Sequence, residues 1–404
     1  MILVGVLIAL VQLVVAFGLA YYYVLLATGG RPRRSAASGA KAQSFLRLAV
    51  AVPAHNEESV IDATVTRLCQ MDYPAEWFDV HVVADHCSDS TAEAARSAGA
   101  TVHERFQAPR GRKAFALQWL LARLLGDPRD YDAIVVFDAD SQVDPAFLRL
   151  MNIALAGGAR VVQGHHVIAN PEASVFSALA DGDMRLNNRM RNQAKENLGL
   201  SARLMGDGMC FHRETLEQHP FETRSLTEDR EYGIHLVACG ERVRYVPEAI
   251  SAGQAVARWR DATSQRMRWY GGVFALPRQH LRPLLSLAWR ERNWAALDLA
   301  LELSVPSFST LSLLAMGLVI LQGLLLLLGA PSPLLVSGFS AAAAFLLPLL
   351  GLAAERAPRT SFQALVFAPA YAAWRVSMGL AVRLRRGRVN WVRTRRAEEQ
   401  AGSE

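Results

Sequence analysis

Charged side chains are scarce in this chain: aspartate, glutamate, lysine and arginine make up 20% of its 404 residues, whereas hydrophobic residues make up 51%. That balance is too apolar for an ordinary soluble enzyme of this size and indicates a part that is embedded in a membrane. The length allows two or three structural units.

Cysteine is also rare. The chain has four cysteines, and none of them forms a C-x-x-C pair. No histidine cluster occurs at the spacing of zinc ligands either, so the sequence carries no recognised zinc motif. We therefore expect reduced thiols of a cytosolic domain at Cys69, Cys87, Cys210 and Cys239.

Nucleic-acid-binding modules are missing as well, although the net charge is +6. Much of the basic excess lies beside apolar segments, in "RPRR" at 31–34, "RLRRGR" at 383–388 and "RTRR" at 393–396. Basic residues gather on the cytoplasmic side of membrane proteins. We interpret the charge as a membrane-topology signal and expect no nucleic-acid partner, because no recognised binding module accompanies it.

The first 26 residues carry no charged side chain. A helix needs ~20 apolar residues to cross a bilayer, so we expect a transmembrane helix over residues 1–28. A cleaved signal peptide is the alternative, but its basic n-region is missing and the apolar run is too long. Basic residues follow the helix, which predicts an N-terminus outside and a cytoplasmic domain after a linker at 29–45.

Residues 46–260 have a different pattern. Short β-type runs such as "FDVHVVAD" and "YDAIVVFDAD" alternate with helix-length amphipathic stretches at 57–70 and 113–125. Strands that alternate with helices indicate an α/β domain with a largely parallel sheet. Ligands of such sheets bind outside the carboxyl ends of the strands. The polar residues that end these runs are therefore candidate site residues: His55–Glu57, Asp85 and Asp138–Asp140.

Long apolar runs return after residue 295. Leu303–Leu328 and Leu334–Ala353 are each long enough to span a bilayer, and Pro306 is expected to kink the start of the first. We expect a transmembrane helical hairpin over 301–354, preceded by interfacial helices over 261–300.

A further apolar run at 362–382 contains Arg375 and Pro369. If this run crossed the membrane, the basic tail would lie outside, against the positive-inside tendency. We therefore expect an interfacial or re-entrant helix and a basic cytoplasmic tail within 355–404, and three spanning helices in all.

Two carboxylates stand one residue apart in "FDADS", directly after a β-type run. Asp138 and Asp140 at a strand end can share a divalent cation and the phosphates that it carries, and Mg²⁺ and Mn²⁺ favour such oxygen ligands. The alternative is a solvated turn, because D-x-D also occurs by chance.

A second acidic group lies in "ADHCSDST" at 84–91, where Asp85 and Asp89 can accept hydrogen bonds from a base or ribose. Its alternative is a helix N-cap, a role that Ser88, Asp89 and Ser90 all suit. Lys113 can pair with a phosphate, although a single lysine is more often a surface residue.

A third acidic pair, Glu228 and Asp229, follows Thr227, which has the character of a helix N-cap with acids in the first turn. The sharper hypothesis makes Asp229 a general base that deprotonates an acceptor hydroxyl. The "GDG" at 206–208 is either a simple turn or a tight loop that lets the backbone approach a ligand.

The ordered set "PAHNEE", "VVADHCSDST", "VVFDADS", "MGDGMCFHRE", "LTEDREYGIHL" and "QRMRW" resembles the membrane-anchored glycosyltransferases of family 2. That group contains the cellulose, chitin, hyaluronan and poly-N-acetylglucosamine synthases. The similarity covers roughly residues 48–275 and the flanking membrane pattern. It implies a GT-A, Rossmann-like nucleotide-sugar domain on the cytoplasmic side of the cell's inner membrane.

The resemblance also implies roles at the donor. Asp85 resembles the acid that contacts the nucleotide base, and Lys113 and Gln265 belong to the same nucleotide-binding set. Asp138 and Asp140 resemble the pair that binds Mg²⁺ or Mn²⁺. Arg268, from the family's Q-x-x-R-W, is expected to meet the donor pyrophosphate, as suits a guanidinium. The alternative is that this motif is only an interfacial anchor.

At the acceptor, the resemblance implies that Asp229 is the catalytic base, with Glu228 beside it, and that Trp269 stacks on a sugar ring. Asp207 occupies a loop position that helps to shape the acceptor end, where many relatives have a smaller or amide residue. His55 also departs from the commonest pattern. The departure at Asp207 puts the identity of the acceptor in doubt.

The activity implied is inverting transfer of a sugar from a nucleotide sugar, most often UDP-linked, to a growing β-linked polysaccharide or oligosaccharide. The competing enzymatic interpretation is a single-addition transferase that acts on a lipid or lipid-linked acceptor. A catalytically dead membrane subunit is a third interpretation, against which the intact carboxylates argue. A homo-oligomer stays open as a partner.

Overall fold

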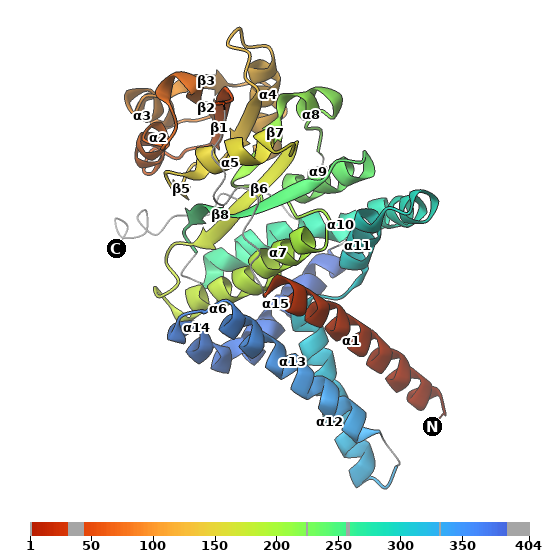
Figure 1. Cartoon of the computed structure of the whole chain (residues 1–404). Coiled ribbons are helices and arrows are strands. Elements are labelled where there is room, and N and C mark those ends of the chain that lie inside the picture. The colour runs from red at the N-terminus through yellow and green to blue at the C-terminus, as the bar shows by residue number, and fades with distance from the viewer. Residues whose placement is uncertain (1, 31–43, 224, 256–258, 331–332, 386–404) are drawn as a thin grey trace.

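The computed structural model describes residues 2–30, 44–223, 225–255, 259–330 and 333–385. A sheet with helices on both faces forms one end of the molecule, and long helices extend from its other end (Figure 1). Most of the expected linker and the basic runs at 31–34 and 393–396 lie outside the described residues.

One eight-stranded sheet organises the first part of the chain, in the order β3-β2-β1-β4-β7-β6-β8-β5. Its strands are β1 (Leu48–Ala54), β2 (Phe78–Asp85), β3 (Thr101–Arg105), β4 (Ala133–Val136), β5 (Gln142–Val143), β6 (Val161–Ile168), β7 (Met209–His212) and β8 (Val243–Gly253).

The sheet is mixed, so the expected α/β class is confirmed but the expectation of a largely parallel sheet is wrong for one half. Pairs β1–β2, β1–β4, β2–β3 and β6–β8 are parallel. Strand β7 runs antiparallel to both β4 and β6, and β5 runs antiparallel to β8. Strand β7 follows the turn at 206–208. It has only four residues, so it is too short to stand out in the sequence as a hydrophobic run.

Two hydrophobic cores lie on the two faces of the sheet. Side chains of β1 alternate between them: Val50 and Val52 belong to one core, and Ala49 and Ala51 to the other. The first core is covered by α2 (Ile61–Cys69), α3 (Thr91–Ser97) and α5 (Phe147–Ala156). The second is covered by α4 (Lys113–Leu125), α8 (Arg213–Gln218) and α9 (Glu228–Ala238).

The first helices of the helical part lie in the sequence between strands β6 and β7. Helices α6 (Val175–Met184) and α7 (Met190–Asn197) form one rod through a π-helical turn at Arg185–Arg189. Next come α10 (Trp259–Glu291), α11 (Trp294–Ser304), α12 (Phe308–Leu327), α13 (Leu334–Ala354), α14 (Arg359–Ala364) and α15 (Ala368–Leu384). The N-terminal α1 (Ile2–Gly29) lies beside α7, α12 and α13 (Figure 1).

Four described helical segments are long and apolar enough to cross a membrane: Leu3–Gly29, Phe308–Leu327, Leu334–Ala354 and Arg359–Leu384. The sequence predicts three, because it treats 362–382 as interfacial or re-entrant. By length and composition the last segment qualifies as a fourth span. That this segment is interfacial or re-entrant therefore stays a prediction.

The apolar run that starts at Leu303 is not one helix. Helix α11 ends at Ser304 and α12 begins at Phe308, with Pro306 in the break between them. Proline has no amide hydrogen to donate and clashes with the preceding turn. The Ser307 hydroxyl accepts a hydrogen bond from the Thr310 amide and so starts the new helix. The expected kink is therefore a full break, which leaves α11 as a separate short helix.

Candidate active site

The two acids of "FDADS" lie directly after β4, in a turn that is hydrogen-bonded to the side chain of Asp207. The Asp138 amide donates to Asp207 Oδ1 over 3.0 Å, and the Ser141 hydroxyl donates to the same oxygen over 2.6 Å. Asp207 Oδ2 lies 2.8 Å from His166 Nδ1. The Asp138 side chain itself is 42% exposed, so its carboxylate is accessible to a ligand while its backbone is fixed.

Asp207 is buried, with 1% of its surface exposed. Burial alone would raise its pKa, but the hydrogen bonds and charge of His166 and the hydrogen bond from Ser141 lower the pKa of Asp207 to about 2. The charge of Asp207 in turn raises the pKa of His166, although burial opposes that shift. In the structure Asp207 therefore orients the Asp138 turn; a contact with the acceptor stays a prediction.

Lys113, the first residue of α4, lies in the same place. Its ammonium group pairs with Asp138 Oδ1 and donates to the Gly206 carbonyl over 2.7 Å. Burial lowers the pKa of Lys113, but Asp138, Glu228 and Asp207 together outweigh burial and hold the pKa above its usual range. Lys113 is therefore a charged residue in contact with the acids and not a free surface lysine.

Gly206 brings the third acidic group to the first two. Its φ of +80° is the left-handed conformation that glycine adopts without strain. A Cβ on Gly206 would stand 3.6 Å from Asp229 Oδ2 and 3.7 Å from Lys113 Nζ. Asp229 and the Lys113–Asp138 pair thus border the same space beside the Gly206 backbone. The chain makes a turn at 206–208 with positive φ at Gly206 and Gly208; approach of its backbone to a ligand stays a prediction.

Glu228 and Asp229 form the first turn of α9, and Thr227 is its N-cap residue as predicted, although its side chain makes no capping hydrogen bond. Burial raises the pKa of Glu228 to about 7, with Lys113 opposing and Asp229 adding to the shift. Burial also raises the pKa of Asp229. A carboxylate whose pKa is raised towards neutrality is suited to accept a proton at physiological pH.

Helix α10 docks on this turn through Gly272. A Cβ there would stand 2.7 Å from both the amide nitrogen and the hydroxyl oxygen of Thr227, so only glycine permits the contact. Arg268 lies four residues earlier and therefore on the same face of the helix. Burial lowers the pKa of Arg268 and the negative charge of Glu228 opposes that shift. The guanidinium of Arg268 accordingly lies within electrostatic reach of the acids.

The neighbours of Arg268 in the motif lie at the surface of this region. Trp269 is 45% exposed, as a side chain that stacks on a ligand must be, and Gln265 is half-buried. The structure thus brings together the acidic turns, Lys113 and the Arg268 helix. The individual roles of these residues stay predictions.

Asp85 lies apart from them, at the end of β2. Its carboxylate is buried, paired with the Arg105 guanidinium and 2.9 Å from His86 Nδ1. Of the three expected cap candidates, Ser90 is the N-cap residue of α3, although its side chain makes no capping hydrogen bond. Asp89 Oδ1 accepts from the Thr91 amide over 3.1 Å. Asp85 makes no such cap, which leaves its predicted contact with a nucleotide base open.

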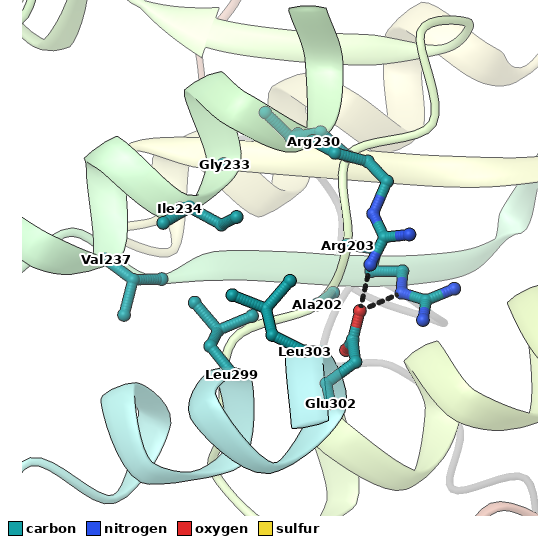
Figure 2. A pocket seen from close by; sticks show the side chains of 10 residues that line it. Ala202, Arg203, Arg230, Gly233, Ile234, Val237, Leu299, Glu302 and Leu303 are labelled. Carbon is teal, nitrogen blue, oxygen red and sulfur yellow. Dashed lines mark hydrogen bonds and ion pairs between the residues drawn. The ribbon is translucent and has the colours of Figure 1, made fainter. Parts of the chain in front are cut away.

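A buried ionic cluster that includes Arg230, the residue after Asp229, was not predicted from the sequence. Figure 2 shows a pocket between α9 and α11 in which Glu302 receives hydrogen bonds from Arg203 and Arg230. Ile234 and Leu299 supply apolar lining to this pocket. A usable signal was present, because an acid in the apolar stretch at 294–304 is costly unless it is paired.

A set of potential metal ligands near the end of α9 was not predicted from the sequence either. Donor atoms of His219, His235 and Cys239 lie within 4.8 Å of one another, at the other end of α9. The three residues form no recognised zinc motif in the sequence, because His219 lies far from His235 in the chain and comes close to it only in the folded structure. All four cysteines are free, as predicted.

A family model described as "Glycosyltransferase like family 2" matches residues 47–272, more than half of the chain. The chain belongs to this family. It is thus a family 2 glycosyltransferase, and the coarse part of the prediction from the motifs is confirmed. The match ends at Gly272, the residue that docks on Thr227, so it includes every candidate site residue named above.

Named relatives of this family 2 glycosyltransferase are distant. "Probable glycosyltransferase YdaM" of Bacillus subtilis is 26% identical over 239 residues, covering 56% of this chain and 55% of the relative. "Beta-monoglucosyldiacylglycerol synthase" of Trichormus variabilis is 27% identical over 238 residues, covering 56% and 49%. The chain spans about half the length of the curated relatives it matches.

A solved structure resembles nearly the whole chain. The mannosyltransferase PcManGT from Pyrobaculum calidifontis, in complex with GDP-Man and Mn²⁺, has a TM-score of 0.55 to this family 2 glycosyltransferase. The match covers 92% of this chain and 99% of that one, at 16% identity. At this identity the likeness shows the fold alone, and it confirms the expected GT-A-like domain with a helical remainder.

Proposed function

We propose that this family 2 glycosyltransferase transfers one sugar, with inversion, from a nucleotide sugar to a hydroxyl of a lipid or lipid-linked acceptor at the membrane. The observation that carries the proposal is the meeting of Asp229, the Lys113–Asp138 pair and the Arg268 helix around Gly206 and Thr227. A general base, a cationic group for phosphate and a pair of potential metal ligands at one place are what sugar transfer from a nucleotide diphosphate needs.

The acceptor follows from two supporting observations. Three cyanobacterial relatives are named beta-monoglucosyldiacylglycerol synthases, and four described helical segments of this chain are long and apolar enough to span a bilayer. The site lies beside α10, which packs against α11 and α15, so an acceptor held in the membrane reaches it without leaving the interface. We place the catalytic domain on the cytoplasmic side, as the basic runs predict.

Asp138 and Asp140 suit a divalent cation. Asp138 is open to solvent on its carboxylate side while its backbone is fixed by Asp207, and two hard oxygen donors fit Mg²⁺ or Mn²⁺. PcManGT was solved with Mn²⁺. When bound, the cation would supply positive charge for the diphosphate leaving group.

The chain's own residues account for the remaining steps. Asp229 takes the proton from the acceptor hydroxyl, whose oxygen forms a bond to the anomeric carbon from the face opposite the diphosphate. The bond between that carbon and the diphosphate oxygen breaks, and the nucleotide diphosphate leaves with the electron pair. Lys113 and Arg268 bring positive charge to where the leaving group becomes more negative. A base of this kind contributes ~10²–10⁴-fold.

A processive polysaccharide synthase is the second candidate, and one specific feature favours it. Gln265, Arg268 and Trp269 match the Q-x-x-R-W of polymer synthases, and the exposed indole of Trp269 is suited to stack on a sugar ring. The two candidates share the donor site and differ in what the acceptor becomes after the first transfer.

One experiment tests the proposal and separates the two. Purified protein in lipid nanodiscs with diacylglycerol is given Mn²⁺ and, one at a time, radiolabelled UDP- and GDP-sugars. The proposal predicts a labelled lipid that carries a single sugar, in step with release of free nucleotide diphosphate. A ladder of longer products would favour the synthase. No transfer and no nucleotide release with any donor would contradict both.

A further inference from the structure

Glu302 is one buried carboxylate that holds three cations from three different parts of the fold. Its side chain is 2% exposed. Oε1 accepts from Arg230 Nη2 of α9 over 2.6 Å and from Arg203 Nε of the segment before β7, as Figure 2 shows. Oε2 pairs with Lys195 of α7, which is fully buried. An unpaired buried charge is strongly unfavourable, so this arrangement depends on Glu302.

Other charged groups complete the surroundings of Glu302. Arg191 of α7 is 4.0 Å from its Oε2. Asp298, one turn earlier on α11, pairs with Lys195 over 2.8 Å and accepts from the Tyr21 hydroxyl of α1 over 3.2 Å. Among the described residues no ion pair joins Asp298 to Arg230. Asp298 is therefore a matched comparison: a second acid on the same face of α11 that pairs with Lys195 but not with the cation of α9.

Arg230 follows Asp229 in the chain, and its guanidinium is attracted by the carboxylates of Asp229 and Glu302. The charge of Arg230 lowers the pKa of Asp229, against the larger effect of burial, which raises it. The other groups that act on Asp229 are Lys113 of α4 and Glu228 of α9. The hydrogen bond to Glu302 directs the Arg230 guanidinium towards α11 (Figure 2).

We infer that Glu302 is a positioning residue for catalysis: by holding Arg230 against α11, it keeps the adjacent Asp229 carboxylate available to the acceptor hydroxyl. This inference rests on the proposed role of Asp229 as the base. Without the negative charge of Glu302, we expect Arg230 to turn towards the carboxylate of Asp229, its neighbour in the chain, and to make it a poorer proton acceptor. We expect donor binding to change little, because the proposed donor groups Asp138, Lys113 and Arg268 lie after β4, on α4 and on α10, and not on α11.

The test compares Glu302→Gln with Asp298→Asn and combines the first with Arg230→Gln. Glu302→Gln keeps the shape and removes the charge; we expect kcat to fall at least ten-fold, with the donor KM changed less than about two-fold. The double variant Glu302→Gln/Arg230→Gln is expected to regain most of that loss, because the neutralising cation is gone. Asp298→Asn is expected to keep the kcat of the wild type per folded molecule.

The outcomes are distinguishable from failure of the proposed function. A Glu302→Gln enzyme no slower than Asp298→Asn, or a double variant as slow as the single one, overturns the inference, since a merely structural role predicts one or the other. If Glu302→Gln does not fold, Glu302→Asp replaces it, because its shorter side chain keeps the charge but withdraws it from Arg230. Full transfer by Asp229→Asn would instead contradict the proposed function itself.

A second inference stands on a separate set of residues at the far end of α9. His235 and Cys239 lie four residues apart and so on one face of the last turn, with Nε2 and Sγ 3.8 Å apart. Two ligands of a tetrahedral zinc ion, at about 2.05 Å for nitrogen and 2.3 Å for sulfur, lie about 3.6 Å from each other. The third donor, from His219, lies within 4.8 Å of both.

The position of His219 is fixed by α9 itself. Its backbone carbonyl accepts from the Tyr232 hydroxyl over 2.6 Å, and its ring packs edge-on against His235 with centroids 6.0 Å apart. His219 begins the connection that ends at Thr227. An ion bound here would therefore join the start of that connection to the last turn of α9.

We propose that His219, His235 and Cys239 bind a borderline or soft divalent cation of the Zn²⁺ class, with water as the fourth ligand. Two imidazoles and one thiolate are the donor set that such ions prefer over Mg²⁺ and Mn²⁺. Binding requires the Cys239 thiol to lose its proton to solvent.

Chelator-treated protein in detergent is titrated with Zn²⁺ by calorimetry and with Co²⁺ by absorption, which reports a thiolate–cobalt bond directly. We expect one equivalent to bind, with at least ten-fold weaker affinity in Cys239→Ser and in His235→Ala. Cys69→Ser, which changes an exposed cysteine on α2, is the control and should bind as the wild type does. Absence of a stoichiometric site, retention in Cys239→Ser, or loss in Asp138→Asn instead would overturn the proposal.

Discussion

Gly272 of α10 lies so close to Thr227 that a Cβ would stand 2.7 Å from the Thr227 amide nitrogen. This contact joins the helix of Arg268 and Trp269 to the turn that starts with Glu228 and Asp229. Because backbone atoms of Thr227 form one side of it, the contact cannot be relieved by a change of rotamer. The relative position of base and arginine therefore depends on a residue that has no side chain.

Gly272→Ala is expected to push α10 away from Thr227 and to lower kcat/KM at least ten-fold, because an ångström-scale displacement of groups in a reacting site costs about that much. Steady-state transfer assays measure the change. Gly317→Ala on α12 is the matched control, since a Cβ there meets nothing within 4 Å. Equal activity of the two variants would mean that the contact does not position the site.

Lys113→Met removes the cation that pairs with Asp138 while keeping much of the apolar stem. We expect the donor KM to rise and kcat to fall, because the positive charge next to the diphosphate is lost. Lys113→Arg should restore part of the activity. A donor KM and kcat equal to those of the wild type in Lys113→Met would remove Lys113 from the donor site.

Asp207→Asn separates two roles for this residue. If Asp207 orients the Asp138 turn, as its hydrogen bonds to the Asp138 amide and Ser141 indicate, the variant weakens activation by Mn²⁺ and leaves the acceptor KM almost unchanged. Titration of activity against Mn²⁺ and against acceptor distinguishes the outcomes. A raised acceptor KM with unaltered Mn²⁺ activation would favour the acceptor role instead.

Glu228 makes stability depend on pH. Its pKa is raised from 4.5 to about 7 in the folded state, so between these values the folded state binds more protons than the unfolded state. Stability conferred by this group is therefore present below pH 4.5 and is lost as pH rises towards 7. Thermal unfolding of Glu228→Gln at pH 5 and pH 8 should show a smaller decrease in Tm than the wild type shows. An equal decrease would contradict the assigned shift.

The sequence predicted the parts of the molecule that local pattern controls. Helix α4 spans 113–125 as expected, and α9 begins after Thr227, because amphipathic spacing and capping residues are local signals. Strands β2 and β4 fall within the predicted β-type runs "FDVHVVAD" and "YDAIVVFDAD". The strand pattern also placed Asp85 and Asp138 at the same edge of the sheet, since carboxyl ends of parallel strands share an edge. That Asp229 lies near Asp138 was implied only by the resemblance.

Features that depend on distant partners were not predictable. Glu302 meets Arg203 across 99 residues, and no pattern in either segment announces the other. The antiparallel direction of β7 is set by the loop that precedes it, not by its four residues. Asp207 has the character of a loop residue in the sequence, yet its buried contacts with Ser141 and His166 exist only once β6 and β7 are paired.

The central claim is that Asp229 removes the proton of the acceptor hydroxyl, and Asp229→Asn tests it most directly. In one preparation, nucleotide-sugar binding is measured by calorimetry with Mn²⁺, and transfer is measured with labelled donor in nanodiscs. The account predicts a donor Kd within about two-fold of the wild type and transfer reduced by ~10²–10⁴-fold. Transfer at the rate of the wild type, with the donor bound equally well, would contradict it.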